Sequence, residues 1–192
     1  SLVFVMVIAL HLLMLAIQYT VAGTLSKKNP FFLMKTMAPA YMTAIGTQSS
    51  AATIPVTLRQ AKKTGASEKV TDFTIPLFAT IHLSGSTITL VSCSIGVLLM
   101  NGMPISFASY LPFILMLGVT MIAAPGVPGG AVMAAVGLLG TMLGFDESMV
   151  ALMIALYMAQ DSFGTATNVT GDGALAMIVD RLTPKVKGVE TK

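Results

Sequence analysis

The chain has 192 residues, of which 55% are hydrophobic and 10% are charged, and its net charge is +3. A soluble domain carries about 25% charged residues, so this composition is not that of a soluble enzyme or binding domain. Lysines and arginines form short clusters between long apolar stretches, so the positive charge reports membrane topology and gives no support for nucleic-acid binding. A single cysteine, Cys93, excludes a disulfide framework and a cysteine-pair metal site.

The first apolar stretch, residues 1–23, predicts a transmembrane helix, because about 20 apolar residues span a bilayer. No initiator methionine, charged leader or cleavage motif accompanies it, so it does not resemble a signal peptide. We therefore expect this chain to be the later part of a longer membrane protein. We interpret His11 in this span as a packed or interfacial residue rather than a ligand.

Residues 30–63 predict a re-entrant hairpin. Basic residues flank the segment on both sides, and such clusters mark the cytoplasmic side of a membrane. Two full crossings need about 40 residues, so this segment is too short to cross twice and we expect it to enter the membrane and return. Its tip should be the small polar stretch at residues 47–53, which is tolerated only where it is buried or lines a cavity.

Residues 70–100 predict a broken transmembrane helix. The middle of this span reads ATIHLSGST at residues 79–87, and an interruption there would free carbonyl groups to face an ion. The alternative is a continuous helix in which serine and threonine hydroxyls bond to their own turns.

Two further elements complete the chain. Residues 105–144 are apolar but contain AAPGVPGG at 123–130, which cannot continue a helix and favours a second re-entrant hairpin over two full spans. Residues 147–182 predict a transmembrane helix with a polar stripe, which leads to a basic tail containing Arg181, Lys185 and Lys187. The fold class is thus an all-α membrane protein whose two hairpin-plus-span units form an inverted-repeat transport core.

The polar stripe of the predicted helix at residues 147–182 contains the candidate binding residues. Its members are Asp161, Thr165, Asn168 and Asp172, and at roughly 100° per residue they fall within an arc of about 60° on one helix face. A carboxylate at membrane depth costs about 2.5 kcal/mol or more, so each one needs a partner. Asp172 is predicted to bind a cation; the alternatives are a neutral acid hydrogen-bonded in the bundle or a proton relay. Asp161 is predicted to pair with the ammonium group of a solute, or else to bond to a hairpin tip.

Thr165, Asn168 and the amide groups at residues 49–53, near the start of the returning half-helix, suit a carboxylate. These groups and Asp161 together match an amino acid. A hydrolytic triad of Ser49 or Ser50 with His82 and Asp161 is disfavoured, because no nucleophile-elbow motif surrounds either serine. A channel is also disfavoured, because channels use rings of groups around an open pore rather than one asymmetric stripe.

These motifs together resemble the dicarboxylate/amino acid:cation symporters, the family of glutamate transporter homologues. The matching segments are TQSSAATIPVT at 47–57, GVPG at 126–129, and the stretch from Asp161 through NVTGD at 168–172. The resemblance covers nearly the whole chain and implies the C-terminal part of that fold. It further implies a multi-pass, non-enzymatic carrier of the cytoplasmic membrane, which is a homotrimer when full-length and is coupled to sodium or, alternatively, to protons.

By position, the resemblance also implies the binding residues. Substrate would contact Ser49, Ser50, Ala124, Gly126, Val127, Asp161, Gly164, Thr165 and Asn168. One sodium site would comprise Asp172 with backbone carbonyls at Phe78, His82 and Asn168. A second would comprise carbonyls at Thr80, Met121, Ile122 and Ala124.

This chain departs from the family pattern at three places. HLSGS at 82–86 stands where the family has Asn-Met-Asp-Gly-Thr, which removes side chains of a further sodium site and leaves the stoichiometry open. Ala51 replaces a third serine, and Gly164 replaces the arginine that grips an acidic side chain. Without a guanidinium there is no bidentate carboxylate clamp. We therefore expect a sodium-coupled carrier of a neutral or larger amino acid, with a dicarboxylate or glutamate carrier as the alternative.

Overall fold

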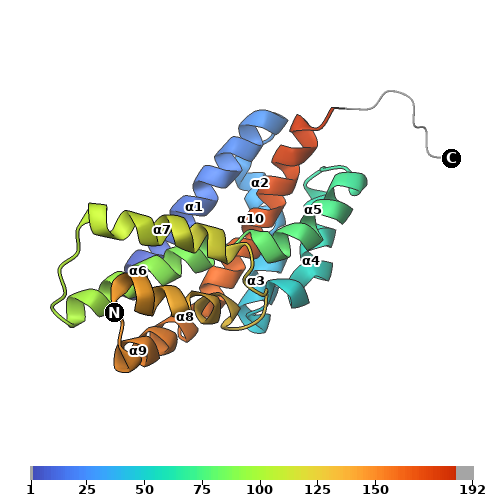
Figure 1. Ribbon diagram of the computed structural model, residues 1–192. Helices are drawn as coiled ribbons and strands as arrows, with labels where there is room; N and C mark the ends of the chain where they lie inside the picture. The colour runs from blue at the N-terminus through green and yellow to red at the C-terminus, as the bar shows by residue number, and fades with distance from the viewer. Residues whose placement is uncertain (1, 185–192) are drawn as a thin grey trace.

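Helices make up the structure, a computed structural model that describes residues 2–184 (Figure 1). In chain order they are α1 (Leu2–Ser26), α2 (Pro30–Thr36), α3 (Ala38–Thr47), α4 (Ser50–Lys63), α5 (Glu68–Ile81), α6 (Ser84–Met100), α7 (Phe107–Met121), α8 (Gly130–Leu143), α9 (Glu147–Met158) and α10 (Asp161–Leu182). The predicted all-α class is confirmed for this range. Lys185 and Lys187 of the expected basic tail lie outside the described residues.

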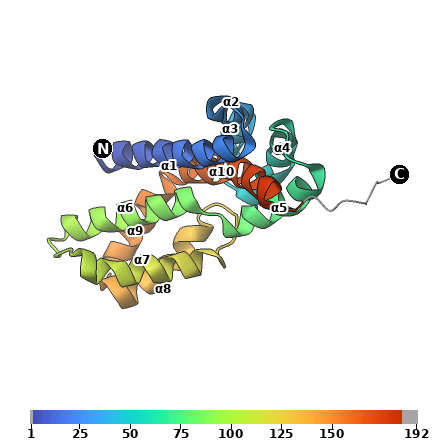
Figure 2. The ribbon, with the colours of Figure 1, turned by 90° about the horizontal axis from the view of Figure 1, so that it is seen from above.

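Two hydrophobic clusters organise these helices. One is built from α1 to α5 together with α10, and the other from α6 to α9 with the connections between them. Figure 2 shows α2 and α3 on one side of α1 and α10, and α6 to α9 on the other side. The chemistry-bearing helix therefore lies at the junction of the two packed units.

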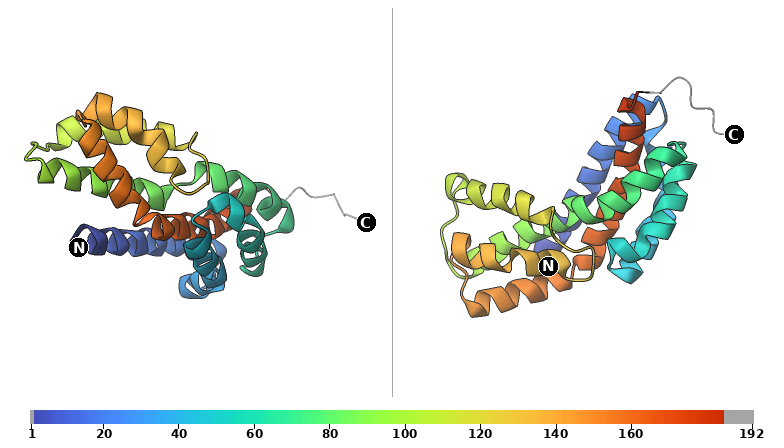
Figure 3. Two further views of the ribbon diagram at one scale, coloured as in Figure 1. Left: turned by 90° about the horizontal axis from the view of Figure 1, so that it is seen from below. Right: turned by 45° about the vertical axis from the view of Figure 1, so that its right-hand side comes forward.

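The helix α10 is the centre of the packing. It contacts α1, α3, α4, α5 and α6, and Figure 3 shows it running between the first span and the two helices α4 and α5. Gly164 lets the backbone of α6 approach closely, as is common between membrane helices. Gly171 and Gly173 instead leave room for side chains of neighbouring helices. The hydroxyl of Tyr19 on α1 donates to the carbonyl oxygen of Thr170 at 2.6 Å. Nearly the whole middle of α10 is buried.

The segment expected as the first hairpin contains a helix–turn–helix. α3 ends at Thr47, Gln48 adopts a left-handed conformation with φ of 51°, and Ser49 caps α4 by accepting from the Ala52 amide at 3.1 Å. The short helix α2 precedes this pair, and Pro39 in the first turn of α3 separates the two. Pro55 lies in the second turn of α4. We call residues 48–49 the first tip.

Residues 70–100 contain two helices that are separated at His82 and Leu83. The amide of His82 still donates to the carbonyl oxygen of Phe78 at 2.9 Å, but His82 itself has an extended conformation and α6 starts afresh at Ser84. The last carbonyl groups of a helix have no successor within it to donate to them. The interruption therefore leaves backbone oxygens near the middle of the bundle.

The segment at 105–144 also consists of two helices joined by a compact connection. α7 ends at Met121, and α8 begins at Gly130 after Gly129 with φ of 71°. We call residues 122–129 the second tip. After α8, Asp146 caps α9 through its carboxylate, and the Met149 amide and the Ser148 hydroxyl that donate to it hold the pKa of this carboxyl below its usual range.

Residues 147–182, predicted as a single helix, form two helices bent by 57°. The cause lies at Gln160, whose amide donates to the Tyr157 carbonyl at 2.8 Å in a tighter turn. The Leu156 carbonyl oxygen accepts from the Gln160 side-chain amide at 3.1 Å, in place of the backbone hydrogen bond that would continue α9. Side-chain competition for a backbone carbonyl is a known way to end a helix. The bend aims the start of α10 at the second tip.

Within residues 2–184, two stretches are long and apolar enough to cross a bilayer, Leu2–Ser26 and Glu68–Met100. The bent pair of α9 and α10 is a third if it is counted as one span. α7 and α8 are apolar but shorter. These lengths agree with a membrane protein in which some segments cross completely.

Candidate functional site

Both tips and the start of α10 meet around one small pocket. The residues that line it come from the two tips and the helices next to them, from the start of α6, and from α9 and α10. They are Gln48, Ser50, Leu83, Ser86, Pro125, Gly126, Val127, Ala131, Tyr157, Asp161, Thr165 and Asn168. The structure thus brings together six of the predicted substrate residues: Ser50, Gly126, Val127, Asp161, Thr165 and Asn168. The cavity measures about 10 Å³, which is about the space that one water requires. A molecule larger than water enters only if the tips separate.

The two tips are bonded to each other through a single carbonyl group. The backbone oxygen of Gly126 accepts from the Ser49 hydroxyl at 2.7 Å and from the Ala51 amide at 3.2 Å. A Cβ atom on Gly126 would lie 2.7 Å from the Ala79 carbonyl oxygen at the end of α5. The glycine therefore permits a close approach of three backbone segments, and a larger residue would hold the tips apart.

Asp161 lies at the first position of α10 and is 3% exposed. Its Oδ2 atom accepts from the Gly129 amide at 2.7 Å. This is the alternative raised for Asp161 from the sequence, a bond between the carboxylate and a hairpin tip. Opening the second tip would free this carboxylate toward the pocket.

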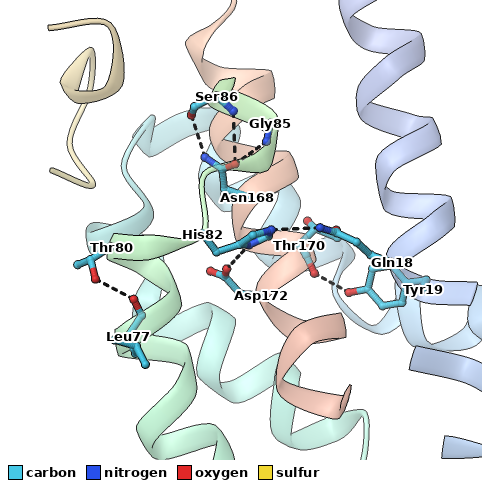
Figure 4. Close-up of polar contacts among 10 residues, drawn as sticks. All are labelled: Gln18, Tyr19, Leu77, Thr80, His82, Gly85, Ser86, Asn168, Thr170 and Asp172. Atoms are coloured by element: carbon cyan, nitrogen blue, oxygen red, sulfur yellow. Dashed lines mark hydrogen bonds and ion pairs between the residues drawn. The ribbon is translucent and has the colours of Figure 1, made fainter. Parts of the chain in front are cut away.

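Asn168 holds the beginning of α6. Its Oδ1 atom accepts from the Gly85 amide at 2.7 Å, and its Nδ2 atom donates to the Ser86 hydroxyl at 2.9 Å (Figure 4). His11 of α1 supports the same turn, because its Nε2 atom lies 3.0 Å from the Gly85 carbonyl oxygen. His11 is 2% exposed, which agrees with its interpretation as a packed residue.

Gly85 is a point where we expect substitution to be harmful. A Cβ atom there would lie 2.7 Å from the Thr167 Cβ atom and would also meet the Gly164 carbonyl. Gly85→Ala should push α6 away from α10 and destabilise the fold by about 1–3 kcal/mol, the usual range for overpacking. Thermal unfolding checks this, with Gly118→Ala as a control because a Cβ atom there meets nothing within 4 Å. Equal melting temperatures for the two variants would contradict the expectation.

Asp172 lies deeper along α10, next to the interruption between α5 and α6. Its side chain is 1% exposed, and its Oδ1 atom lies 2.8 Å from the Nδ1 atom of His82 (Figure 4). The other imidazole nitrogen is 3.1 Å from the Gln18 side-chain nitrogen on α1. His82, whose side chain the sequence left unassigned, is therefore the immediate partner of Asp172.

The remaining predicted sodium ligands are less closely assembled. The Phe78 carbonyl accepts the His82 amide, and the Met121 carbonyl accepts the Ala124 amide at 3.2 Å. Thr80 directs its hydroxyl to the Leu77 carbonyl at 2.7 Å and is exposed. Ile122 is 59% exposed, whereas Ala124 is buried at the base of the second tip.

Gly164 does not line the pocket. A Cβ atom on it would point at the start of α6, 3.4 Å from the Ser86 amide nitrogen and 3.5 Å from the Gly85 carbonyl carbon. Ser49 and Ala124 also lie outside the lining, although Ser49 bonds to it through Gly126. The sequence reasoning missed Gln18, Tyr157 and Gln160. An isolated glutamine or tyrosine within an apolar run is a usable signal, because each polar group at membrane depth needs a partner.

The triad residues considered for hydrolysis do not form a relay in this arrangement. His82 bonds to Asp172 and Gln18, Ser49 to the Gly126 carbonyl, and Asp161 to the Gly129 amide. Each side chain that such a relay would use is directed to a different partner.

Comparison with known proteins shows the family to which this chain is similar. A family model described as the sodium:dicarboxylate symporter family matches residues 1–182. The chain is 32% identical to an excitatory amino acid transporter of Caenorhabditis elegans and 32% identical to excitatory amino acid transporter 3 of Mus musculus, covering 80% and 83% of this chain. It is 30% identical to excitatory amino acid transporter 1 of Homo sapiens over 82% of this chain. It spans 31%, 30% and 29% of the lengths of these relatives. The chain therefore belongs to the sodium:dicarboxylate symporter family.

Proposed function

We propose that the protein containing this chain is a sodium-coupled symporter that carries a neutral or larger amino acid across the cytoplasmic membrane. The single observation that carries this proposal is the pocket between the tips, which has one carboxylate, Asp161, and several neutral hydrogen-bonding groups. A carboxylate pairs with the ammonium group that every amino acid has. The amides at the start of α4 and the hydroxyl of Thr165 suit the carboxylate group of the solute.

The absence of a basic side chain in the pocket supports a neutral substrate. None of the residues that line it is lysine or arginine in the described structure, and the sequence has neither between Lys69 and Arg181. A second carboxylate on the substrate would then enter a buried site without a positive partner, which is strongly unfavourable. The family's description as dicarboxylate symporters and the names of the relatives keep an acidic substrate as the second candidate.

Sodium is the proposed coupling ion, with Asp172 as its charged ligand. Backbone oxygens from Phe78, His82 and Asn168 would complete this site, because hard cations prefer oxygen ligands. Carbonyls at Thr80, Met121, Ile122 and Ala124 are proposed for a second ion. The two helix–turn–helix units would enter the membrane from opposite sides as re-entrant hairpins, in units related as an inverted repeat. In the full-length protein we propose a homotrimer whose scaffold lies outside this chain.

The transport step follows from the contacts of the tips. The second tip must leave Asp161 and Ser49 before a solute can enter, because its bonds to both residues close the pocket. Closure over the bound solute would then restore a sealed unit, which moves relative to the scaffold. This carrier mechanism requires saturable flux, whereas a channel would conduct without saturation at the same concentrations.

A substrate panel tests the proposal. Full-length protein in proteoliposomes should take up serine, alanine or cystine when sodium is higher outside, and uptake should saturate with substrate. Uptake of aspartate or glutamate should be weaker by about tenfold or more, since an unpaired buried charge costs over about 1.4 kcal/mol. A tight preference for aspartate would refute the neutral specificity, and uptake that ignores the sodium gradient would refute sodium coupling.

A further inference from the structure

The imidazole of His82 is hydrogen-bonded to Asp172, which is the one carboxylate of the proposed cation site. Its Nδ1 atom lies 2.8 Å from Oδ1 of Asp172, a distance typical of a strong hydrogen bond to an ionised acceptor. A carboxylate only accepts hydrogen bonds, so Nδ1 carries the hydrogen and donates it. The neutral imidazole then has its Nε2 atom free to accept, and the Gln18 side-chain amide donates to that atom at 3.1 Å.

The surrounding residues pack closely around this imidazole. A Cβ atom on Gly171 would lie 2.6 Å from Cε1 of His82 and 2.5 Å from Oε1 of Gln18, so only glycine at 171 leaves room for both side chains. The Phe78 ring packs edge-on against the imidazole with the centroids 6.5 Å apart. Residues from α1, α5 and α10 thus hold the ring against Asp172, as Figure 4 shows for Gln18.

The hydrogen bond from His82 competes with a cation for the Oδ1 atom of Asp172. A hard cation needs oxygen atoms around it, and here the space next to Oδ1 holds an N–H group whose hydrogen points at the carboxylate. Neither imidazole nitrogen has a free lone pair for the ion, because Nδ1 carries a hydrogen and Nε2 accepts from the Gln18 amide. The imidazole must rotate away before an ion can take its place on Oδ1 of Asp172.

We propose that His82 is an internal competitor for the coupling cation at Asp172, and that it sets the sodium affinity of this transporter. The inference rests on the proposed function, because it takes Asp172 as the cation ligand. A hydrogen bond to a charged group shifts an equilibrium by about 10- to 100-fold. Removing the imidazole should therefore lower the sodium concentration needed for half-maximal binding by about that factor.

The test measures sodium binding directly in the purified full-length protein. Thermal unfolding is followed as sodium chloride replaces choline chloride at constant ionic strength, since an ion that binds the folded state raises the melting temperature. His82→Ala and His82→Asn both remove the imidazole, so either variant that folds can report. Sodium-dependent uptake of the preferred amino acid provides the second readout.

The control is a set of double variants with Asp172→Asn. If His82 acts through this carboxylate, His82→Ala should lower the half-maximal sodium concentration only while Asp172 is present. His82→Ala combined with Asp172→Asn should then match Asp172→Asn alone. A purely structural role for His82 would instead shift melting temperatures in sodium and choline equally.

The outcomes separate the two proposals. Sodium-dependent uptake by the wild type with an unchanged half-maximal concentration in both His82 variants overturns the competition and leaves the symport intact. A shift that persists in the Asp172→Asn background also overturns it. No response to sodium in the wild type, but a response in His82→Ala, supports the competition and argues against sodium as the physiological coupling ion. If neither the wild type nor His82→Ala responds to sodium, both the competition by His82 and the sodium coupling are overturned.

Discussion

Asp161→Asn should abolish amino-acid binding while leaving the protein folded. The asparagine side chain keeps an oxygen that can accept from the Gly129 amide, which the carboxylate now does at 2.7 Å. It removes the charge that would face an ammonium group, and losing one partner of a buried charge pair costs about 2–5 kcal/mol of binding. Uptake of serine or alanine in proteoliposomes checks the expectation, together with a thermal unfolding curve.

The matched control for this substitution is Asp146→Asn. Asp146 caps α9 at the surface, and the same change there removes a charge outside the pocket. Asp161→Ala should also abolish binding, but it additionally removes the bond to the second tip, so only the asparagine variant separates charge from closure. Normal half-saturation in Asp161→Asn would show that the solute amino group binds elsewhere.

Asp172→Asn should lower the sodium affinity by about tenfold or more, because it removes the charged ligand from a buried cation site and one lost decade is about 1.4 kcal/mol. The asparagine can still accept from His82, so the packing around the interruption between α5 and α6 should persist. The sodium concentration for half-maximal uptake measures the effect.

Asp180→Asn is the control for Asp172→Asn, since Asp180 lies on the same helix and accepts the Ser67 amide at 3.1 Å near the surface. Its sodium dependence should match the wild type. If Asp172→Asn and Asp180→Asn give the same sodium dependence, Asp172 is not a cation ligand.

Several features were accessible from the sequence because they depend on local pattern. The spacing of Asp161, Thr165 and Asn168 placed them on one helix face, and the structure finds all three lining one pocket. The segment around Ser49 is too short to cross the membrane twice between its basic flanks, and the proline-glycine stretch around Gly126 cannot continue a helix. Both contain turns between two helices in the structure. Chain order and residue type alone carried these predictions.

Other features depend on partners that are distant in the chain. Nothing near His82 shows that Asp172, 90 residues away, will accept its hydrogen bond, or that Gln18 will contact its other nitrogen. The bend before α10 arises from one glutamine side chain that competes for a backbone carbonyl. Gly164 was expected to face the substrate, yet helix packing turns it toward α6. Such choices are made by tertiary contacts that no local pattern encodes.

The main chain of the second tip offers an uncharged donor and an uncharged acceptor, which correspond to the ammonium and carboxylate groups of the proposed amino-acid substrate. Its Gly129 amide is a hydrogen donor on Asp161, where an ammonium would sit, and its Gly126 oxygen is an acceptor on Ser49 and Ala51, where a carboxylate would sit. Under the proposed function, the second tip would stand in for the solute in the closed state, and an entering solute would replace hydrogen bonds that the tip now makes. The carboxylate of Asp161 and the hydroxyl of Ser49 would then keep a hydrogen-bond partner both with the tip closed and with solute bound.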